Sequence, residues 1–417
     1  MDFQSINKCF ESEHFNKMMM MMNLQSYYRH QKTILNGFFL LIQLLILMKT
    51  INAFNDQHQP KRICYLLIEN QQNHLIPIDQ LKYSLCTHWI FSFAHLDDYN
   101  VNVSTLMDDY IRKVMSSTNN QTEQYYLISI GTTDMSFVDN PKKIEKFIDS
   151  IIQLMDRFYL DGFDLDWEFP MQRKHQFTHL LRMIRYRFKH KFNHRGKPYI
   201  LSVALSPVIY IVETSYDIHS IGHLVDFVNL MTYDFHSPNT IPYTNFNSPL
   251  YANQLDRLYF EYFNTNFAVN YMIQLGLLPQ KIMVGIPFYG YKYYLVNKNF
   301  HNLYALSNGT EVPVAFNEIC DDFLLDPNTT IVFDHYSKVP YAYREYEWIT
   351  YDDYESITIK AQWIMDNHLG GSMTFPLNYD DYNGEKCINN KQQQQQQRQR
   401  RRSKHYPLQS ILFDIIN

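Results

Sequence analysis

Glycine is scarce in this sequence, with 12 residues in 417, and no glycine-rich phosphate loop is present. An open doubly wound nucleotide-binding sheet carries such a loop after its first strand, so nothing in the sequence supports that fold. The formal net charge of −5 is modest for this length. Because nucleic-acid-binding proteins need a strongly basic face, we expect no nucleic-acid partner.

Cysteine is scarce too, with five residues and no Cys-x-x-Cys pair, which argues against a metal-binding cysteine cluster. Cys9 precedes the segment that we interpret as a signal peptide, so the mature chain keeps four cysteines. An even set in a secreted chain predicts two disulfides, and the residues alone leave their pairing open.

The N-terminal residues 1–53 are typical of an extension followed by a signal peptide. Arg29 and Lys32 precede the apolar run Ile34–Met48, and small Ala53 follows it. The run is shorter than the about 20 apolar residues that span a membrane. We therefore expect a secreted, extracellular protein without stable membrane association, and a retained signal anchor is the alternative. Four N-glycosylation acceptors also suit secretion, namely Asn102, Asn120, Asn308 and Asn328.

From residue 61 onward, short apolar or β-branched runs alternate with helix-like segments. The expected strands are 63–68, 88–96, 125–130, 163–168, 200–206, 227–233, 282–288 and 371–375. The clearest helix is Pro141–Phe158, whose apolar residues recur at helical spacing. This alternation predicts an α/β fold with parallel strands and crossover helices, and eight strands predict a closed (β/α)8 barrel, the TIM barrel.

The domain organisation follows from two interruptions of this pattern. Residues 291–349 are rich in Tyr, Phe, Asn and Pro and are too many for a structureless loop. We predict a small α+β insertion domain there, between strands seven and eight, which divides the barrel into 61–290 and 350–390. Residues 391–404 form a low-complexity Gln/Arg segment, expected to be a solvated linker, with protease cleavage after Arg401 as the alternative. Residues 405–417 are expected to be a C-terminal barrel helix.

The stretch DGFDLDWE, from Asp161 to Glu168, places four acids among Phe, Leu and Trp. On a strand, alternate side chains share a face, so Asp164, Asp166 and Glu168 should all point into the barrel. Three acids on one inward face cannot all ionise cheaply, so at least one should keep a proton near neutral pH. Cleavage of a glycosidic bond needs such a proton for its leaving group. Glu168, nearest the strand end, is the candidate acid, and an exposed strand without function is the alternative.

The same stretch resembles glycoside hydrolase family 18, the chitinases and chitinase-like lectins, because it matches the D-G-x-D-x-D-W-E motif of that family. The resemblance covers about residues 61–417 and includes the segments SLCTHWIFSFA, VDFVNLMTYDFH, KIMVGIPFYG and LGGSMTF. It implies that no cofactor or metal is needed. It also implies the disulfides Cys64–Cys86 and Cys320–Cys387.

The resemblance further implies a chitinase that cleaves β-1,4-linked N-acetylglucosamine polymers or oligomers by substrate-assisted retention. Glu168 would act as acid and then as base, and Asp166 would hold the acetamide N–H of the sugar. Asp164 would share a proton with Asp166, and Tyr233 would bond the acetamide oxygen.

The resemblance also implies supporting roles for other residues of this chain. Met231 and Asp234 would line the acetamide subsite, whereas Asp161 and Gly162 would support the strand geometry. The partner would be chitin or N-acetylglucosamine oligosaccharides, bound by a monomer.

The chain departs from the family pattern at the expected sugar-binding floor. Tyr291 replaces an arginine, Phe375 replaces a tryptophan, and the third strand reads SIGTTD instead of S-x-G-G. The first strand, which continues LLIENQQN, also lacks its usual aromatic residue. The intact acids favour an active enzyme, and the altered floor favours the alternative, a catalytically weak or inactive glycan-binding lectin.

Overall fold

The computed structural model describes Met20 and residues 59–69, 75–118, 123–387 and 404–416. The predicted signal peptide and nearly all of the Gln/Arg segment lie outside these residues. No helix within the described ranges is long and apolar enough to cross a membrane.

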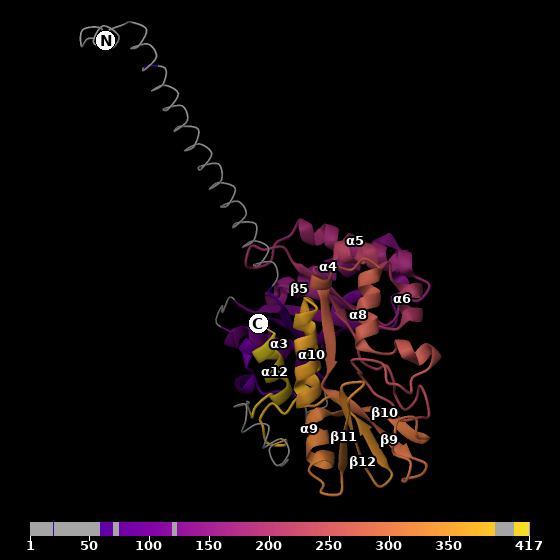
Figure 1. Cartoon of the computed structure of the whole chain (residues 1–417). Helices are drawn as coiled ribbons and strands as arrows, with labels where there is room; N and C mark the ends of the chain where they lie inside the picture. Colours follow the sequence, from indigo (N-terminus) through magenta and orange to yellow (C-terminus); the bar gives the residue numbers. More distant parts are fainter. Residues whose placement is uncertain (1–19, 21–58, 70–74, 119–122, 388–403, 417) are drawn as a thin grey trace, which may run out of the picture. The chain divides into compact units, whose positions relative to one another are not determined.

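Eight parallel strands close into a barrel, which confirms the predicted fold (Figure 1). Strand β1 pairs with β14 on one side and with β2 on the other, and this closes the sheet. The barrel strands are β1 (Lys61–Leu67), β2 (His88–Asp97), β4 (Tyr125–Thr132), β5 (Gly162–Trp167), β6 (Ile200–Leu205), β7 (Phe227–Leu230), β8 (Ile282–Pro287) and β14 (Gly371–Phe375). A short strand, β3 (Asn100–Asn102), pairs antiparallel with β2.

Helices follow the strands and cover the outside of the barrel (Figure 1). They are α3 (Thr105–Ser117), α4 (Pro141–Phe158), α5 (Lys174–Lys189), α6 (Ile209–Ser215), α7 (Ile218–Leu224), α8 (Thr265–Gln274), α10 (Tyr354–Asp366) and α12 (Pro407–Ile415). Helix α4 has the bounds that its periodicity predicts. Asn140 caps it by accepting hydrogen bonds from the backbone N–H groups of Lys142 and Lys143, and Pro141 suits the first turn.

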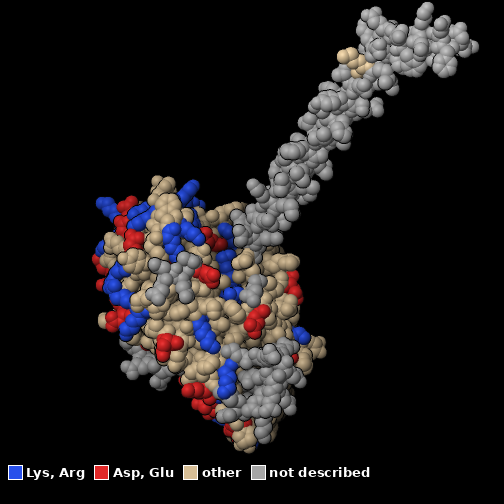
Figure 2. All heavy atoms as spheres, turned by 90° about the vertical axis from the view of Figure 1, so that its left-hand side faces the viewer, with Lys and Arg blue, Asp and Glu red and all other residues tan. Residues whose placement is uncertain are grey.

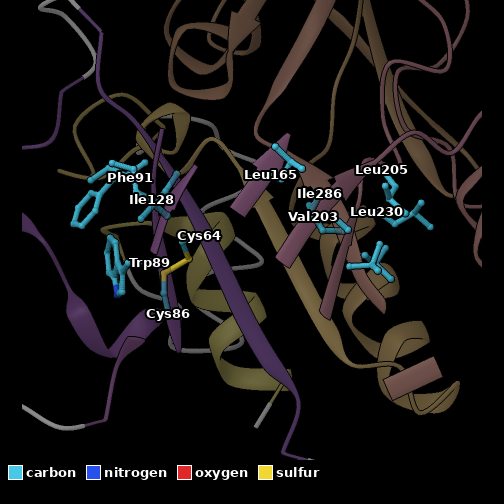
Figure 3. Packing of buried hydrophobic residues seen from close by; sticks show 14 of the residues in the cluster. Cys64, Cys86, Trp89, Phe91, Ile128, Leu165, Val203, Leu205, Leu230 and Ile286 are labelled. Carbon is cyan, nitrogen blue, oxygen red and sulfur yellow. A yellow bond between two sulfur atoms is a disulfide. The ribbon is translucent and has the colours of Figure 1, made fainter. Parts of the chain in front are cut away.

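The outward faces of the strands pack against the helices in one apolar layer (Figure 3). On β5 this layer contains Phe163, Leu165 and Trp167, which alternate with the acids. A shift of one residue in the register of β5 would move the acids into this layer, where ionised groups are costly. The apolar residues of β5 therefore fix the acids on the inward face.

Two disulfides tie the barrel together, and both match the pairing that the resemblance implies. Cys64–Cys86 joins β1 to the residues before β2, with the sulfur–sulfur bond visible in Figure 3. Cys320–Cys387 joins the inserted region to the chain after β14.

Between β8 and β14 the chain forms a second, five-stranded antiparallel sheet, as the long connection predicts. Its strands are β9 (Tyr289–Leu295), β10 (Ser307–Ala315), β11 (Thr330–Asp334), β12 (Val339–Arg344) and β13 (Glu347–Thr350). Two short helical segments, α9 (Phe316–Glu318) and η6 (Ile319–Leu324), lie between β10 and β11. Only Phe288 separates β8 from β9, so this sheet begins at the C-terminal mouth of the barrel, where TIM-barrel enzymes have their active sites.

Lysine and arginine side chains lie among acidic side chains on the face shown in Figure 2. Among the surface pairs, Lys146 pairs with Asp98 at 2.8 Å, and Lys191 pairs with Asp156 at 2.6 Å. Exposed pairs of this kind contribute about 0–1 kcal/mol each to stability. On the face shown in Figure 2, acidic side chains interrupt the positive charge.

Candidate active site

The acids of β5 lie at the mouth of the barrel. Asp164 and Asp166 are buried, whereas Glu168, the first residue after the strand, is exposed. A cavity of about 630 Å³ opens beside them and is lined by Phe93, Gly131, Thr132, Thr133, Asp166, Glu168 and Phe169. A ligand in this cavity would therefore meet Asp166 and Glu168 directly.

Asp161 and Gly162 lie at the opposite end of β5. Asp161 accepts hydrogen bonds from the backbone N–H of Tyr126 at 2.9 Å and from Asn193 Nδ2 at 3.1 Å, and it pairs with Arg195 at 3.0 Å. A Cβ atom on Gly162 would lie 2.5 Å from the carbonyl oxygen of Ile200, so a side chain would force β5 and β6 apart. These contacts support the structural role that the resemblance implies.

Asp164 is surrounded by hydrogen-bond donors from four other strands. Its carboxylate accepts from Tyr65 Oη at 2.7 Å, Ser129 Oγ at 2.7 Å, Ser202 Oγ at 2.6 Å and Asn229 Nδ2 at 3.0 Å. Burial raises the pKa of Asp164, and these four hydrogen bonds oppose that rise because they stabilise the ionised form. None of these four donors was predicted from the sequence, although a small polar residue inside an apolar strand is a signal that could have revealed three of them.

Asp166 has the opposite surroundings. Its Oδ1 atom is buried and finds no hydrogen-bond partner within the described part of the chain. Burial raises the pKa of Asp166 well above its usual value, and the negative charges of Glu168 and Asp164 raise it further. Both burial and the neighbouring negative charges thus favour the protonated form of Asp166.

Glu168 combines access to the cavity with a raised pKa. Although the side chain is exposed, the surrounding mouth removes part of its hydration, which is the largest cause of this rise, and the negative charge of Asp234 is the second. A raised pKa keeps the carboxyl protonated to higher pH, which is what a proton donor to a leaving group requires.

The segment after β7 differs from the predicted strand 227–233. Strand β7 ends at Leu230, because the N–H groups of Thr232 and Tyr233 bond locally to the carbonyl oxygens of Leu230 and Met231, at 2.8 and 2.7 Å. Asp234 then takes a left-handed backbone conformation, with φ 56°. Met231 and Tyr233 are buried in the inner cluster of the barrel, beside the acids.

Phe375, at the end of β14, is half-buried and forms an aromatic floor with its neighbours. Its ring stacks on Tyr233, with centroids 5.9 Å apart, and meets the edge of Tyr65 at 5.7 Å. Tyr65 lies on β1, so the first strand does contribute an aromatic ring to the floor, which the sequence analysis missed. Such a floor suits the apolar face of a sugar ring.

Tyr291, which stands where the resemblance implies an arginine, contacts Asp234. Asp234 Oδ1 accepts hydrogen bonds from Tyr289 Oη at 2.7 Å and from Tyr291 Oη at 2.8 Å. A hydroxyl group donates a hydrogen bond but brings no positive charge. The structure thus brings together the predicted residues after β7, on β9 and on β14.

The groups that meet in this site are carboxyls, hydroxyls and aromatic rings. Among the described residues, no three His, Cys, Asp or Glu side chains gather in a way that could hold a metal ion. The site as built is suited to proton transfer and to holding a sugar.

Known proteins resemble this chain over most of the described residues. The model of glycosyl hydrolases family 18 matches residues 61–380. The oviduct-specific glycoprotein of Mesocricetus auratus is 30% identical over 382 residues, which cover 84% of this chain and 54% of that protein. This chain thus spans about half the length of that relative.

Two solved structures share the fold and 26–27% identity with this chain. An immunomodulatory active chitinase from Trichuris suis has a TM-score of 0.77 over 86% of this chain and 100% of that one. Human YKL-39, a pseudo-chitinase with retained chitooligosaccharide binding, has a TM-score of 0.75 over 86% of this chain and 99% of that one. With the family model matching most of its length, this chain belongs to glycosyl hydrolase family 18, which includes both active chitinases and inactive chitinase-like proteins.

Proposed function

We propose that this protein is a secreted chitinase that hydrolyses β-1,4-linked N-acetylglucosamine polymers or oligomers by substrate-assisted retention. One observation carries the proposal. Glu168, with a raised pKa, lines the same cavity as Asp166, whose buried Oδ1 lacks a partner within the described residues. The two disulfides support secretion, since such bonds persist in oxidising compartments.

In the first step Glu168 donates its proton to the glycosidic oxygen, and the bond between that oxygen and the anomeric carbon breaks. The acetamide oxygen of the same sugar attacks the anomeric carbon, which forms an oxazolinium ion. Asp166 accepts the acetamide N–H with Oδ1 and so orients the attacking group. This assignment uses the one buried carboxyl oxygen of the site that is left without a partner in the described chain.

In the second step Glu168, now ionised, takes a proton from water as that water attacks the anomeric carbon. The oxazolinium ring opens, and the sugar regains its acetamide with the original configuration at the anomeric carbon. Tyr233 donates a hydrogen bond to the acetamide oxygen in both steps. Asp164, held by its four donors, shares a proton with Asp166, and Asp166 stabilises the positive ring.

The floor of the site supports a sugar as substrate. Phe375 offers its half-buried ring beside Tyr233, and Met231 lies buried in the same inner cluster. Sugar rings place their apolar C–H faces on such aromatic surfaces. Met231, Asp234 and Tyr291 are proposed to line the subsite around the acetamide.

A glycan-binding lectin with weak or no turnover is the second candidate. It is favoured by the contact of Asp234 with two tyrosine hydroxyls, because Tyr291 supplies no positive charge where the resemblance implies an arginine. The similarity to YKL-39, a pseudo-chitinase that retains chitooligosaccharide binding, points the same way.

The test is incubation of the purified protein with soluble N-acetylglucosamine oligomers, followed by sizing of the products, with the Glu168→Gln variant as control. Shorter oligomers from the wild type and none from the variant support the chitinase. Binding of the oligomer by calorimetry without products would replace it by the lectin. Absence of both binding and products would contradict both candidates.

A further inference from the structure

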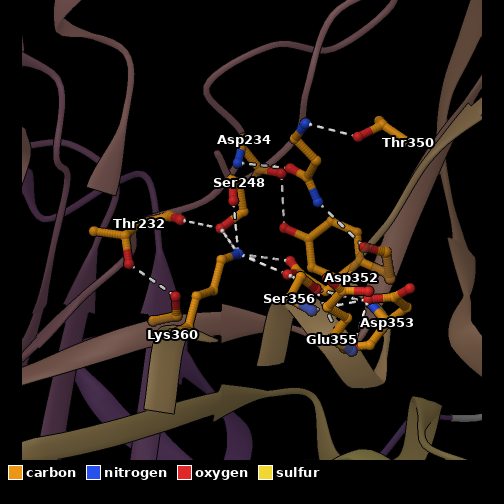
Figure 4. Close-up of polar contacts among 12 residues, drawn as sticks. Thr232, Asp234, Ser248, Thr350, Asp352, Asp353, Glu355, Ser356 and Lys360 are labelled. Carbon is orange, nitrogen blue, oxygen red and sulfur yellow. Dashed lines mark hydrogen bonds and ion pairs between the residues drawn. The ribbon is translucent and has the colours of Figure 1, made fainter. Parts of the chain in front are cut away.

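A buried lysine lies behind the active site. Lys360, in the middle of α10, is only 1% exposed. Its Nζ donates to the carbonyl oxygen of Ser248 at 2.6 Å, to Ser248 Oγ at 3.0 Å and to Asp352 Oδ2 at 2.8 Å (Figure 4). An ammonium group has three hydrogens, so these contacts satisfy all of its donors. Burial of a charge is costly unless it is paired in this way.

Two of the three contacts of Lys360 are with Ser248 rather than with the acid. Ser248 Oγ in turn donates to the carbonyl oxygen of Thr232 at 2.6 Å (Figure 4). Thr232 is fixed a second time, because its own hydroxyl donates to the carbonyl oxygen of Gly285 on β8 at 2.8 Å. Thr232 directly precedes Tyr233, so Lys360 reaches the active-site segment through a single side chain.

The neighbouring Asn247 holds the other side of Tyr233. Its Oδ1 accepts from the backbone N–H of Asp234 at 2.8 Å, and its carbonyl oxygen accepts from the N–H of Phe235 at 3.1 Å. Its Nδ2 donates to the carbonyl oxygen of Tyr289 at 3.2 Å. Asp234 has the left-handed φ of 56°, a conformation that is uncommon for residues other than glycine, and its N–H is held by the contact with Asn247.

We propose that Lys360 is a positioning residue for Tyr233 and Asp234. It anchors residues 247–248, and these fix the backbone immediately before and after Tyr233. Lys360 itself has no place in the lining of the cavity. The inference rests on the proposed function for the roles of Tyr233 and Asp234, and it adds the element that holds them in place.

The test compares Lys360→Met with a matched control, Lys281→Met. Lys281 is half-buried and its Nζ also donates to two backbone carbonyl oxygens, those of Gly222 and Val225, both at 2.7 Å. It precedes β8, at the end of the barrel away from the acids. Each variant removes hydrogen bonds from a lysine to backbone carbonyl oxygens, but only Lys360→Met removes contacts with residues 247–248.

We expect Lys360→Met to lower kcat per folded molecule about tenfold while KM rises no more than about threefold, since a small misplacement of a catalytic group is costly. Lys281→Met should keep the kcat and KM of the wild type. Ser248→Ala, which leaves the Lys360–Asp352 pair intact, should also lower kcat, with a smaller loss of melting temperature. Lys360→Met or Ser248→Ala with wild-type kcat would overturn the proposal.

The same variants separate this inference from the proposed function. If the wild type shows no hydrolysis, the chitinase proposal fails, and the dissociation constant for an N-acetylglucosamine tetramer becomes the measurement. Lys360→Met should then raise that constant about threefold, because misplaced contacts bind less well, whereas Lys281→Met should not. Equal constants in the wild type and in Lys360→Met would overturn the positioning role.

Discussion

Asp164 and Asp166 lie on the same face of β5 with one residue between them, yet their surroundings differ. Asp164 is deep in the barrel and accepts hydrogen bonds from four donors. Asp166, nearer the mouth, lines the cavity and has an Oδ1 without a partner in the described chain. Two identical side chains on one strand therefore have very different hydrogen-bond surroundings.

One strand thus holds a carboxyl group with four hydrogen-bond donors beside a carboxyl group that has an oxygen without a partner in the described chain. Donors stabilise the ionised form of Asp164, and burial without donors favours the protonated form of Asp166. Glu168 is exposed at the rim and can exchange its proton with a ligand or with solvent. The sharing of a proton between Asp164 and Asp166 stays a prediction.

The largest expected effect comes from removing the proton of Glu168, the acid at the mouth of the barrel. Glu168→Gln keeps the shape of the side chain but cannot donate a proton, so hydrolysis should fall about 10²–10⁴-fold. Steady-state kinetics on an unactivated oligomer measures the change, and circular dichroism checks that the fold is kept. Turnover within about twofold of the wild type would show that another group is the acid.

The deep and the shallow aspartate should respond differently to the same substitution. Asp164→Asn places an amide N–H group among the four donors that surround this side chain. The hydrogen-bonding groups left unpaired should lower the free energy of unfolding by about 3 kcal/mol. Asp166→Asn changes a residue whose Oδ1 has no partner within the described chain, so we expect a loss below about 1 kcal/mol.

Urea denaturation of both variants at neutral pH measures these losses. For the acetamide contact the order should be reversed: Asp166→Asn should weaken that contact more than Asp164→Asn does, because of the two aspartates only Asp166 lines the cavity. Equal losses of stability in the two variants would mean that the four donors around Asp164 do not distinguish it from Asp166.

The pKa of Glu168 also depends on a residue outside β5. The negative charge of Asp234 contributes to the raised pKa of Glu168. As general acid Glu168 must be protonated, so activity is present below its pKa and is lost as pH rises through it. Asp234→Asn removes the charge and lowers that pKa, which should move the alkaline limb of the kcat profile to lower pH.

The matched control for this prediction is Tyr291→Phe. It removes one hydrogen bond to Asp234 but leaves the negative charge in place. Its alkaline limb should not move to lower pH. An alkaline limb in Asp234→Asn at or above the wild-type position would contradict the role of this charge.

The sequence predicts the barrel and the inward face of the acids from local periodicity, and it predicts the insertion from the length of the connection between strands seven and eight. It does not predict the donors around Asp164, which come from β1, β4, β6 and β7 and meet only when the barrel closes. Lys360 was also missed, since a lysine in an amphipathic helix is usually solvated. Its burial depends on Asp352 and Ser248, and Ser248 lies more than a hundred residues away in the chain.

The smallest expected effect is at the floor of the site. Phe375 packs against Tyr65 and Tyr233 at 5.7 and 5.9 Å but remains half-buried, and its ring centroid lies 6.2 Å from that of Phe93, which lines the cavity. An indole offers a sugar more apolar area than a phenyl ring, and an improved stacking contact is worth about 0.5–1.5 kcal/mol. Phe375→Trp should therefore raise kcat/KM on soluble oligomers about threefold.

A larger ring can also collide with Tyr289, whose centroid lies 6.4 Å from that of Phe375. The melting temperature distinguishes the two outcomes, because a collision lowers it and a better floor does not. The wild type, with the smaller ring and no arginine at Tyr291, has less binding energy to distort the sugar toward its transition state. It should cleave short soluble oligomers faster than crystalline chitin. Equal efficiency on the two substrates would show that other aromatic residues of the mouth supply the missing contacts.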